Sequence, residues 1–273
     1  MPVVKDIESF LIPLMHAVRT KLFDKREAIH FLHIGKCAGS QVRILAQDIN
    51  ARSKTLRIVK HRHDFYFDRL RETDRYFFSI RDPISRFRSG FYCRKRRSQP
   101  VYDFAWSSGE SLAYNHFEHA NDLAEALFSE GETGRQAFMA MKSIRHTAQN
   151  QVDWFARFGD IFVTRPPVWI IRQENFEDDL AVLSRLLGAD LVGIVQQQRG
   201  TGAAFHSNDY AGARPLSELA KANLTRWYAQ DFEFYKACEN WIHEQPEGTK
   251  PVSASIRTSG MAAYSHPTPV FGS

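Results

Sequence analysis

The residues best suited to bind an anion lie in a short loop, 35–40, that connects a predicted strand to a predicted helix. An apolar run at 29–34 ends where the loop begins, and a helical pattern starts at Gln41. Loop amides and the positive end of a helix dipole both favour an anion in such an arrangement, and Lys36 adds a full positive charge. Small residues let a ligand approach the backbone closely, and here they are Gly35, Ala38 and Gly39.

The loop differs from the phosphate-binding loop of ATPases and kinases, G-x-x-x-x-G-K-[ST]. Aligned on Gly35 and Lys36, that pattern requires a glycine and a hydroxyl residue where this chain has His30 and Cys37. The absent hydroxyl is the group that binds Mg²⁺ in those proteins. The loop therefore predicts a phosphate site without a magnesium ligand.

Two histidines, His61 and His63, follow a predicted strand at 55–60. Residues i and i+2 of an extended chain point the same way, so both are expected near the carboxyl edge of the sheet, where ligands bind. Imidazole titrates near neutral pH and can act as a general base. Two surface histidines, or a pair that hydrogen-bonds locally, fit the spacing equally well, whereas a metal site lacks a third ligand nearby.

A second group of polar residues follows the predicted strand 75–80. Arg81 lies at the end of this strand, and Asp82 with Pro83 predicts the N-cap and first residue of a helix. Ser89 lies about two turns into the helix, on a different side from the expected buried stripe of Ile84, Phe87 and Phe91.

Strands alternate with helices along the chain, which predicts an α/β fold with a central, mainly parallel sheet flanked by helices. Asn175 and Asp178 predict the N-terminal cap of one helix, Gly188 its end, and Ser217 the start of the last helical region. The four predicted strands are 29–34, 55–60, 75–80 and 168–172, and the other helices are 7–22, 41–49, 83–97, 116–128 and 134–144.

The remaining segments are predicted to be irregular. Segments 98–111 and 145–151 lack a clear period, and with the helices between them they could wall a substrate cleft. A flexible loop is expected at 196–209. One domain is expected over 1–245, followed by a flexible tail at 246–273 that is rich in Pro, Ser, Thr and Gly.

Composition narrows the class of partner and compartment. The net charge of +5 and the pI near 9.1 favour an anionic partner. The basic run 94–97 predicts either a solvated helix face or a surface facing a polyanion.

Three widely spaced cysteines form neither a disulfide framework nor a metal motif, which favours a reducing compartment. The first residues lack a signal-peptide pattern and no stretch is apolar enough to span a membrane, so a cytoplasmic protein is expected.

Two of these segments carry a family resemblance. Residues 31–40, FLHIGKCAGS, resemble the 5'-phosphosulfate loop of sulfotransferases that use 3'-phosphoadenosine 5'-phosphosulfate (PAPS). The most similar branch contains the carbohydrate 2-O-sulfotransferases and their bacterial relatives, where the loop typically reads H-I-P-K-[TC]-[GA]-G-[ST]. Residues 77–92, FFSIRDPISRFRSGFY, resemble the family's 3'-phosphate motif, R-D-P-x-x-R-x-x-S-x-[YF]. Residues 172–176, RQENF, resemble a later family segment more loosely.

The resemblance implies a P-loop-like sulfotransferase fold and a role for each motif residue. Lys36 is expected at the 5'-phosphosulfate and its bridging oxygen, Arg81 and Ser89 at the 3'-phosphate, and His63 as the base with His61 beside it. The phosphosulfate group is expected to be held by Gly35, Lys36, Cys37, Ala38, Gly39, Ser40 and Gln41.

The resemblance also implies a reaction, in-line transfer of a sulfuryl group to an acceptor hydroxyl, expected on a carbohydrate. Adenosine 3',5'-bisphosphate (PAP) is then the product, and no metal, nucleic acid or membrane is involved. The chain departs from the family at Gly35, where proline is usual, and at Cys37 and Ala38, where Thr-Gly is commoner. The alternatives are an unusual P-loop kinase or nucleotide hydrolase, and a non-enzymatic polyanion-binding module built on the basic run.

Overall fold

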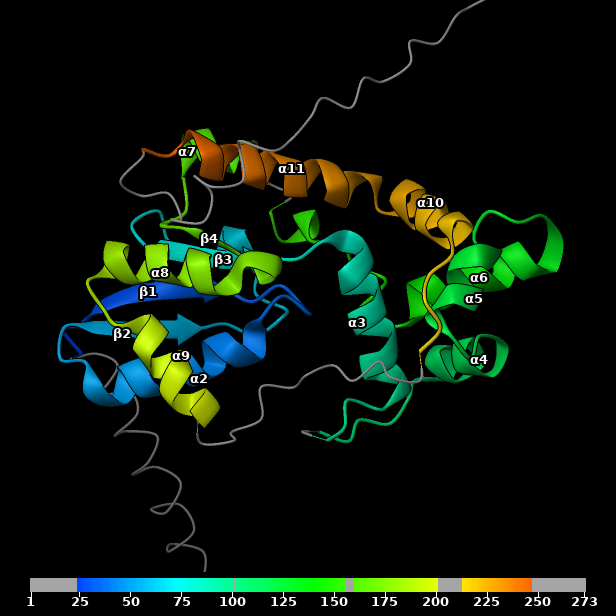
Figure 1. Ribbon diagram of the computed structural model, residues 1–273, viewed down its shortest axis with the longest axis horizontal. Coiled ribbons are helices and arrows are strands. Elements are labelled where there is room, and N and C mark those ends of the chain that lie inside the picture. Colours follow the sequence, from blue (N-terminus) through cyan, green and yellow to red (C-terminus); the bar gives the residue numbers. More distant parts are fainter. Residues whose placement is uncertain (1–23, 101, 156–159, 201–212, 247–273) are drawn as a thin grey trace, which may run out of the picture.

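A four-stranded parallel sheet lies at the centre of one half of the molecule (Figure 1). The computed structural model describes residues 24–100, 102–155, 160–200 and 213–246. The strand order is β2-β1-β3-β4, and each neighbouring pair is parallel. The strands are β1 (Glu27–Leu32), β2 (Leu56–Lys60), β3 (Arg75–Ile80) and β4 (Ile170–Arg172). The α/β class with a parallel sheet is therefore confirmed.

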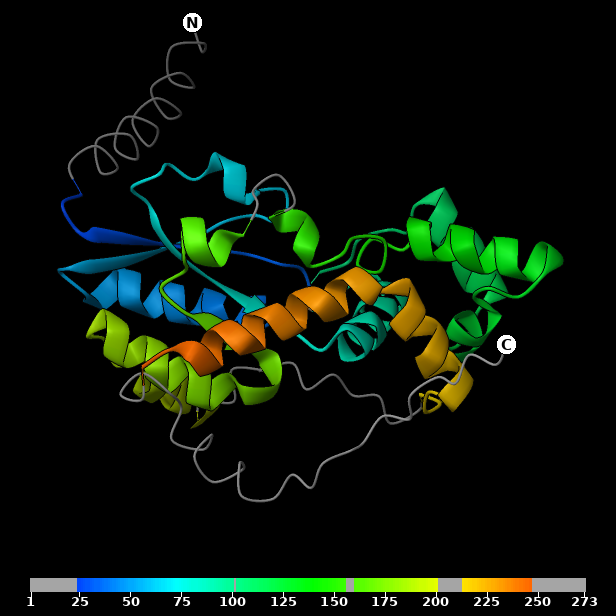
Figure 2. The same cartoon turned by 90° about the horizontal axis from the view of Figure 1, so that it is seen from above.

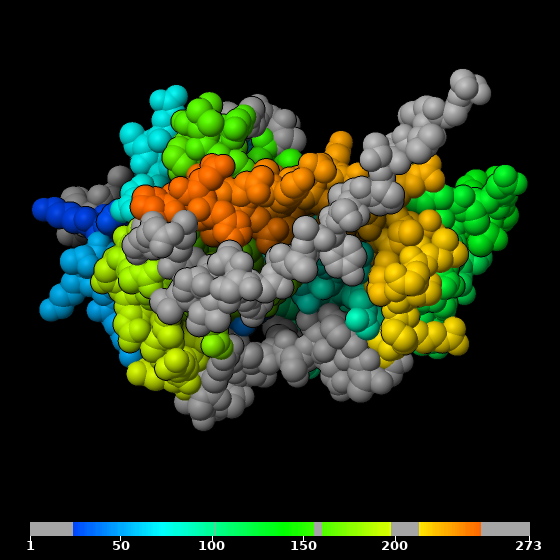
Figure 3. All heavy atoms as spheres, turned by 45° about the horizontal axis from the view of Figure 1, so that its top comes forward, coloured from blue at the N-terminus to red at the C-terminus, as the bar shows by residue number. Residues whose placement is uncertain are grey.

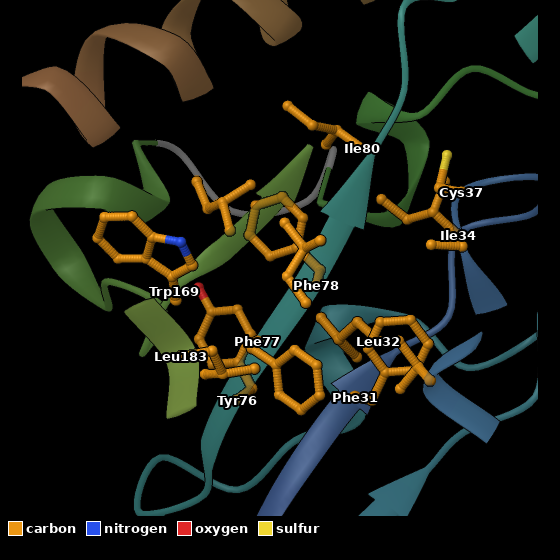
Figure 4. Close-up of a cluster of buried hydrophobic side chains, with 14 of the residues drawn as sticks. Phe31, Leu32, Ile34, Cys37, Tyr76, Phe77, Phe78, Ile80, Trp169 and Leu183 are labelled. Carbon is orange, nitrogen blue, oxygen red and sulfur yellow. The ribbon is translucent and has the colours of Figure 1, made fainter. Parts of the chain in front are cut away.

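The two central strands are apolar on both faces, as strands covered on both sides must be. Phe31 of β1 pairs in register with Phe77 of β3, and both side chains are buried. Figure 4 shows Phe31 beside Phe77, within a cluster of buried side chains that also includes Tyr76, Phe78 and Trp169, which precedes β4. Tyr76 and Phe78 alternate with Phe77 along β3 and so point to the other face of the sheet. This packing fixes the carboxyl ends of β1 and β3 side by side, so the loops that follow them are neighbours.

Helices flank the sheet. Helix α2 packs beside β2 and α8 packs beside β4, while α9 packs against both helices. Helix α11 runs past β3 and β4, with Phe234 near Phe78 and Trp241 near Trp169. The bounds are α2 (Gly39–Arg52), α8 (Phe176–Leu187), α9 (Leu191–Gly200) and α11 (Ala229–Glu244).

Most residues of a second hydrophobic cluster come from five helices, and these helices form the other half of the molecule (Figure 2). The helices are α3 (Pro83–Lys95), α4 (Ser108–His116), α5 (Ala120–Ala126), α6 (Gly131–Ser143) and α10 (Glu218–Trp227). In Figure 3, α11 (orange) lies over the half that contains the sheet and leads into α10 (gold) at the other half. Segment 98–111 was expected to be irregular, but α4 begins within it because Ser107 and Glu110 form a reciprocal capping box.

Short elements complete the described structure: η1 (Phe67–Arg69), η2 (Val152–Trp154), α7 (Ile161–Thr164) and η3 (Gln173–Asn175). The predicted cap at Asp82 is confirmed, because its Oδ1 accepts the amide of Ser85 at 2.7 Å. Gly188 ends α8 in the left-handed conformation, also as predicted. Asn175 precedes α8, but its side chain makes no capping bond.

Two predicted segments fall wholly or largely outside the described residues. The helix at 7–22 lies outside them, as does nearly all of the tail at 246–273. The prediction of a flexible loop from Gln196 is wrong up to Gly200, where α9 continues. Leu191 and Val195 of α9 are buried, and burial of one apolar face favours the helix over a polar loop. The rest of that loop, 201–209, lies outside the described residues.

Candidate functional site

The loop after β1 has the backbone geometry of an anion-binding nest. Lys36 and Ala38 have positive φ angles of 69° and 54°, whereas Cys37 between them does not. Alternation of left- and right-handed residues turns successive amides towards one point, which suits an anion. Ala38 is also the N-cap of α2, so the positive end of that helix lies at the same place. Left-handed residues other than glycine are strained, and such strain often occurs at functional sites.

Three successive carbonyl groups of this loop accept hydrogen bonds from side chains of the β3–α3 region. Arg86 Nε donates to the Gly35 carbonyl at 3.0 Å, and Arg81 Nη1 donates to the Lys36 carbonyl at 3.5 Å. Ser79 Oγ donates to the carbonyl of Cys37. In a trans peptide the carbonyl and the following amide point in opposite directions. The amides of Lys36 and Ala38 therefore face away from these donors, whereas the amide of Cys37 donates to the carbonyl of Ile34 at 3.4 Å.

Gln151 joins the two sequence motifs. Its Oε1 accepts the thiol of Cys37 at 3.2 Å and the amide of Arg81 at 2.9 Å, and its Nε2 donates to the Arg81 carbonyl at 2.8 Å. The backbone N–H of Gln151 in turn donates to Oδ1 of Asp231, in α11, at 2.6 Å. Sequence reasoning missed Gln151, because a single glutamine in the polar stretch 145–151 carries no periodic or motif signal.

His63 is oriented to act as a proton acceptor. Its Nδ1 lies 3.0 Å from the carbonyl oxygen of His33, and a carbonyl oxygen can only accept. The proton therefore sits on Nδ1 and the lone pair on Nε2. Burial lowers the pKa of His63 below its usual value, so the imidazole is neutral at pH 7.

His61 has different neighbours, although it is only two residues away. Its Nε2 lies 2.8 Å from Nδ1 of His30, and its ring stacks on Phe65 with centroids 3.6 Å apart. Burial lowers the pKa of His61 to about 4. The structure thus pairs His61 with His30 of β1, 31 positions away in the sequence, rather than in a local pair, and places His63 with His33.

A third histidine, His146, lies beside the loop and was not identified from the sequence. Its ring is 6.0 Å from that of His63, edge to face. A Cβ atom on Gly35 would lie 3.3 Å from His146 Nδ1, and one on Gly90 would lie 3.0 Å from His146 Cβ. The two glycines therefore make room for His146. Burial, followed by the positive charge of Lys36, lowers the pKa of His146 well below its usual value.

Gly39 has a structural role besides its small size at the loop. A Cβ atom there would lie 1.7 Å from Nε2 of His33, whose ring is only 9% exposed. The missing side chain leaves space for the His33 imidazole, and the carbonyl of the same residue holds His63. Burial lowers the pKa of His33 to about 2, so this imidazole remains neutral.

The two residues expected at a 3'-phosphate differ in access. Arg81 is half-buried, and within the part of the chain that the structure describes its Nε has no hydrogen-bond partner. Ser89 is on the same helix but only 1% exposed. Of the two, Arg81 is the group that a ligand can reach in this arrangement. At the start of α2, Ser40 is exposed and Gln41 half-buried.

The basic run 94–97 is largely engaged within the protein. Arg94 is buried, and its guanidinium makes a two-bond pair with Glu110 at 2.6 and 2.7 Å. Arg97 pairs with Asp103 at 2.9 Å. The prediction of a solvated face is therefore wrong for Arg94, because the acidic partner comes from the first turn of α4.

Among the described residues, no group of three or more His, Cys, Asp or Glu side chains is placed to hold a metal ion. Within the same residues, no helix combines the length and the apolar character needed to cross a membrane. Comparison with models of known protein families and with curated proteins finds no match to this chain.

Proposed function

We propose that the protein is a PAPS-dependent sulfotransferase that transfers a sulfuryl group to an acceptor hydroxyl. The observation that carries this proposal is the pairing of an anion nest at Lys36 with the oriented imidazole of His63 beside it. The nest supplies the charge-binding half of a group-transfer site, and the imidazole supplies the proton-accepting half. The resemblance of the two sequence motifs to those of sulfotransferases supports the choice of donor.

At the donor end, the amides of 38–41, the Ser40 hydroxyl and Lys36 would hold the 5'-phosphosulfate. The amide of Cys37, which the family resemblance also implies as a donor, already bonds to the carbonyl of Ile34 at 3.4 Å. Arg81 donates a hydrogen bond to the carbonyl of Lys36 in the same loop, and its guanidinium would bind the second phosphate. Arginine suits a phosphate because its planar donors match two oxygens at once. Two separate cationic groups at one loop agree with a donor that carries charge at both its 5' and 3' positions.

At the acceptor end, Nε2 of His63 would take the proton of the attacking hydroxyl. The hydroxyl oxygen bonds to sulfur, and the bond from sulfur to the bridging phosphate oxygen breaks. Lys36 stabilises the charge that develops on that leaving oxygen. The products are a sulfate ester and PAP, with the proton on His63. A positioned base contributes about 10²- to 10⁴-fold to such a rate, and the family resemblance favours a carbohydrate hydroxyl as acceptor.

A polyanion-binding module is less well supported. That alternative depended on the basic run, and two of its arginines already pair with Glu110 and Asp103. A polyanion-binding module also gives no reason for the orientation of His63 or for the left-handed backbone at Lys36. A kinase-like site would require magnesium ligands, and the hydroxyl that such a loop uses is replaced by Cys37, whose thiol is buried.

The proposal is tested by ligand-induced thermal stabilisation. PAP without magnesium is expected to raise the melting temperature, because a ligand at about 100 times its Kd adds about 2.7 kcal/mol to the unfolding free energy. Lys36→Ala and Arg81→Ala should each reduce this shift. Lys54→Ala is the matched control, since Lys54 is an exposed lysine beyond the far end of α2. Stabilisation by ATP and Mg²⁺ but not by PAP would overturn the proposal.

A further inference from the structure

His146 lies beside both the loop at Gly35 and the ring of His63. Its Nδ1 lies 3.3 Å from the point where a Cβ of Gly35 would be, and Nδ1 of His63 lies 3.8 Å from the same point. Both imidazoles therefore pack over Gly35. Lys36, the next residue, exerts the largest charge effect on the pKa of His146, and Arg86 and Arg145 act in the same direction.

The backbone around His146 is held firmly, so its side chain has a defined place. Thr147 Oγ1 donates to the carbonyls of Met141 and Ile144, and the Thr147 carbonyl accepts the hydroxyl of Tyr228 at 2.8 Å. The amide of Arg145 donates to Glu110. Gly90 of α3 lets the His146 backbone approach that helix closely. A pre-positioned donor loses little free energy to reorganisation when a ligand arrives.

We propose that His146 is a second catalytic imidazole, whose Nδ1–H donates a hydrogen bond to the sulfuryl group during its transfer. This inference rests on the proposed function. The group would sit between Lys36, on the leaving-oxygen side, and His63, on the acceptor side. Nδ1 is the imidazole atom placed nearest the loop backbone. A neutral donor suits this position, because another cation beside Lys36 and Arg86 would be repelled, whereas an N–H dipole still stabilises developing negative charge.

Three variants separate a hydrogen-bond donor from a packing role. His146→Phe keeps a ring but has no donor, His146→Asn keeps an N–H close to the position of Nδ1, and His146→Gln carries its N–H further from the backbone. His243→Ala is the control, since His243 is exposed near the end of α11. Two measurements are made on each variant: stabilisation by PAP, and the release of labelled sulfate from ³⁵S-labelled PAPS to water across a range of pH.

We expect His146→Phe to lower the rate about 100-fold or more, as removal of one preorganised donor does elsewhere, while PAP stabilisation stays at the wild-type size. His146→Asn should recover most of the rate and His146→Gln little of it. The acid limb of the pH profile should persist in all three, because His63 remains the base.

A rate for His146→Phe within about threefold of wild type would overturn the inference, as would loss of the acid limb, which would make His146 the base. Equal rates for the Asn and Phe variants would also overturn it. Failure of PAP to stabilise the wild-type protein is a different result, because it removes the proposed function itself. If the Phe variant shows no cooperative melting, the rates of the His146→Asn and His146→Gln variants are compared instead. A donor role requires the Asn variant to be the faster, and equal rates would overturn the inference.

Discussion

The carboxamide of Gln151 bonds to both backbone polar groups of Arg81, accepting from the amide at 2.9 Å and donating to the carbonyl at 2.8 Å. The two residues are 70 positions apart in sequence. Because the same oxygen accepts the thiol of Cys37, one buried side chain connects the strand end before α3 to the anion loop. The relative position of the two proposed phosphate-binding groups, Lys36 and Arg81, therefore depends on a residue from neither motif.

Gln151→Met should reduce both stability and ligand affinity. Methionine has a similar shape but cannot pair with the Arg81 backbone, and a buried polar group left without a partner costs about 1–3 kcal/mol. We expect the urea midpoint to fall accordingly and the affinity for PAP to fall about tenfold or more. Asn150→Met is the neighbouring control, because the Asn150 side chain makes only a 3.5 Å contact with Gln230, and it should stay within about 0.5 kcal/mol of wild type. Equal effects of the two substitutions would contradict the linking role.

Gly39→Ala should be strongly destabilising, and His33 is the reason. The added Cβ would overlap the buried imidazole, and overpacking of this kind costs about 1–3 kcal/mol. In a His33→Ala background the space is vacant, so the same substitution should cost much less. A double-mutant cycle in urea measures the difference, which we expect to exceed about 1 kcal/mol. An unchanged cost in the two backgrounds would show that the clash lies elsewhere.

His63→Ala should abolish sulfuryl transfer and leave PAP stabilisation intact. The reason is that His63 is placed as the base, whereas the donor is held by the nest and Arg81. We expect a loss of about 10²- to 10⁴-fold in kcat. His61→Ala should retain most of the activity, since His61 bonds to His30. The assay is labelled sulfate release, and full activity in His63→Ala would transfer the base role to another group.

The protein should lose stability as the pH falls below about 6.5. Burial lowers the pKa of five histidines, and in the unfolded chain each regains an ordinary pKa near 6.5. Below that pH the unfolded chain binds protons on these imidazoles before the folded chain does. The free energy of unfolding therefore falls by at most about 1.4 kcal/mol per pH unit for each group, and only between about pH 6.5 and the pKa of that group in the folded state. The five are His30, His33, His61, His63 and His146.

Asp231 acts in the opposite sense, as do Asp179 and Glu239, because burial raises the pKa of these carboxyl groups. Burial raises the pKa of Asp231 to about 6, so it takes up a proton on folding between about pH 4 and 6 and offsets one histidine there. Urea unfolding at pH 7.5 and pH 5.0 should therefore still show a lower midpoint at pH 5.0. His33→Phe should reduce the difference between the two midpoints, by at most the contribution of one titrating group. Equal midpoints at the two pH values would contradict this account.

Local sequence signals determined the sheet and the helix starts that lead to the site. Strand β3 has the predicted bounds, and Asp82 caps α3 as predicted, because propensity and capping depend on residues a few positions apart. The same signals located the loop at Lys36, since its small residues and its place between a strand and a helix can be read directly. These signals did not decide whether His61 and His63 have a catalytic or a structural role, because spacing alone does not identify the neighbours of a side chain.

Only the tertiary structure decided which residues surround that loop. His146 and Gln151 come from a segment without sequence periodicity and reach the loop because that segment packs against α3 at Gly90 and bonds to α11 at Asp231. The different surroundings of His61 and His63 follow from packing as well, since His61 contacts His30 of β1 and His63 contacts the carbonyl of His33 just beyond that strand. Such contacts join residues distant in sequence, and their energies depend on burial and hydrogen-bond geometry that no local pattern encodes.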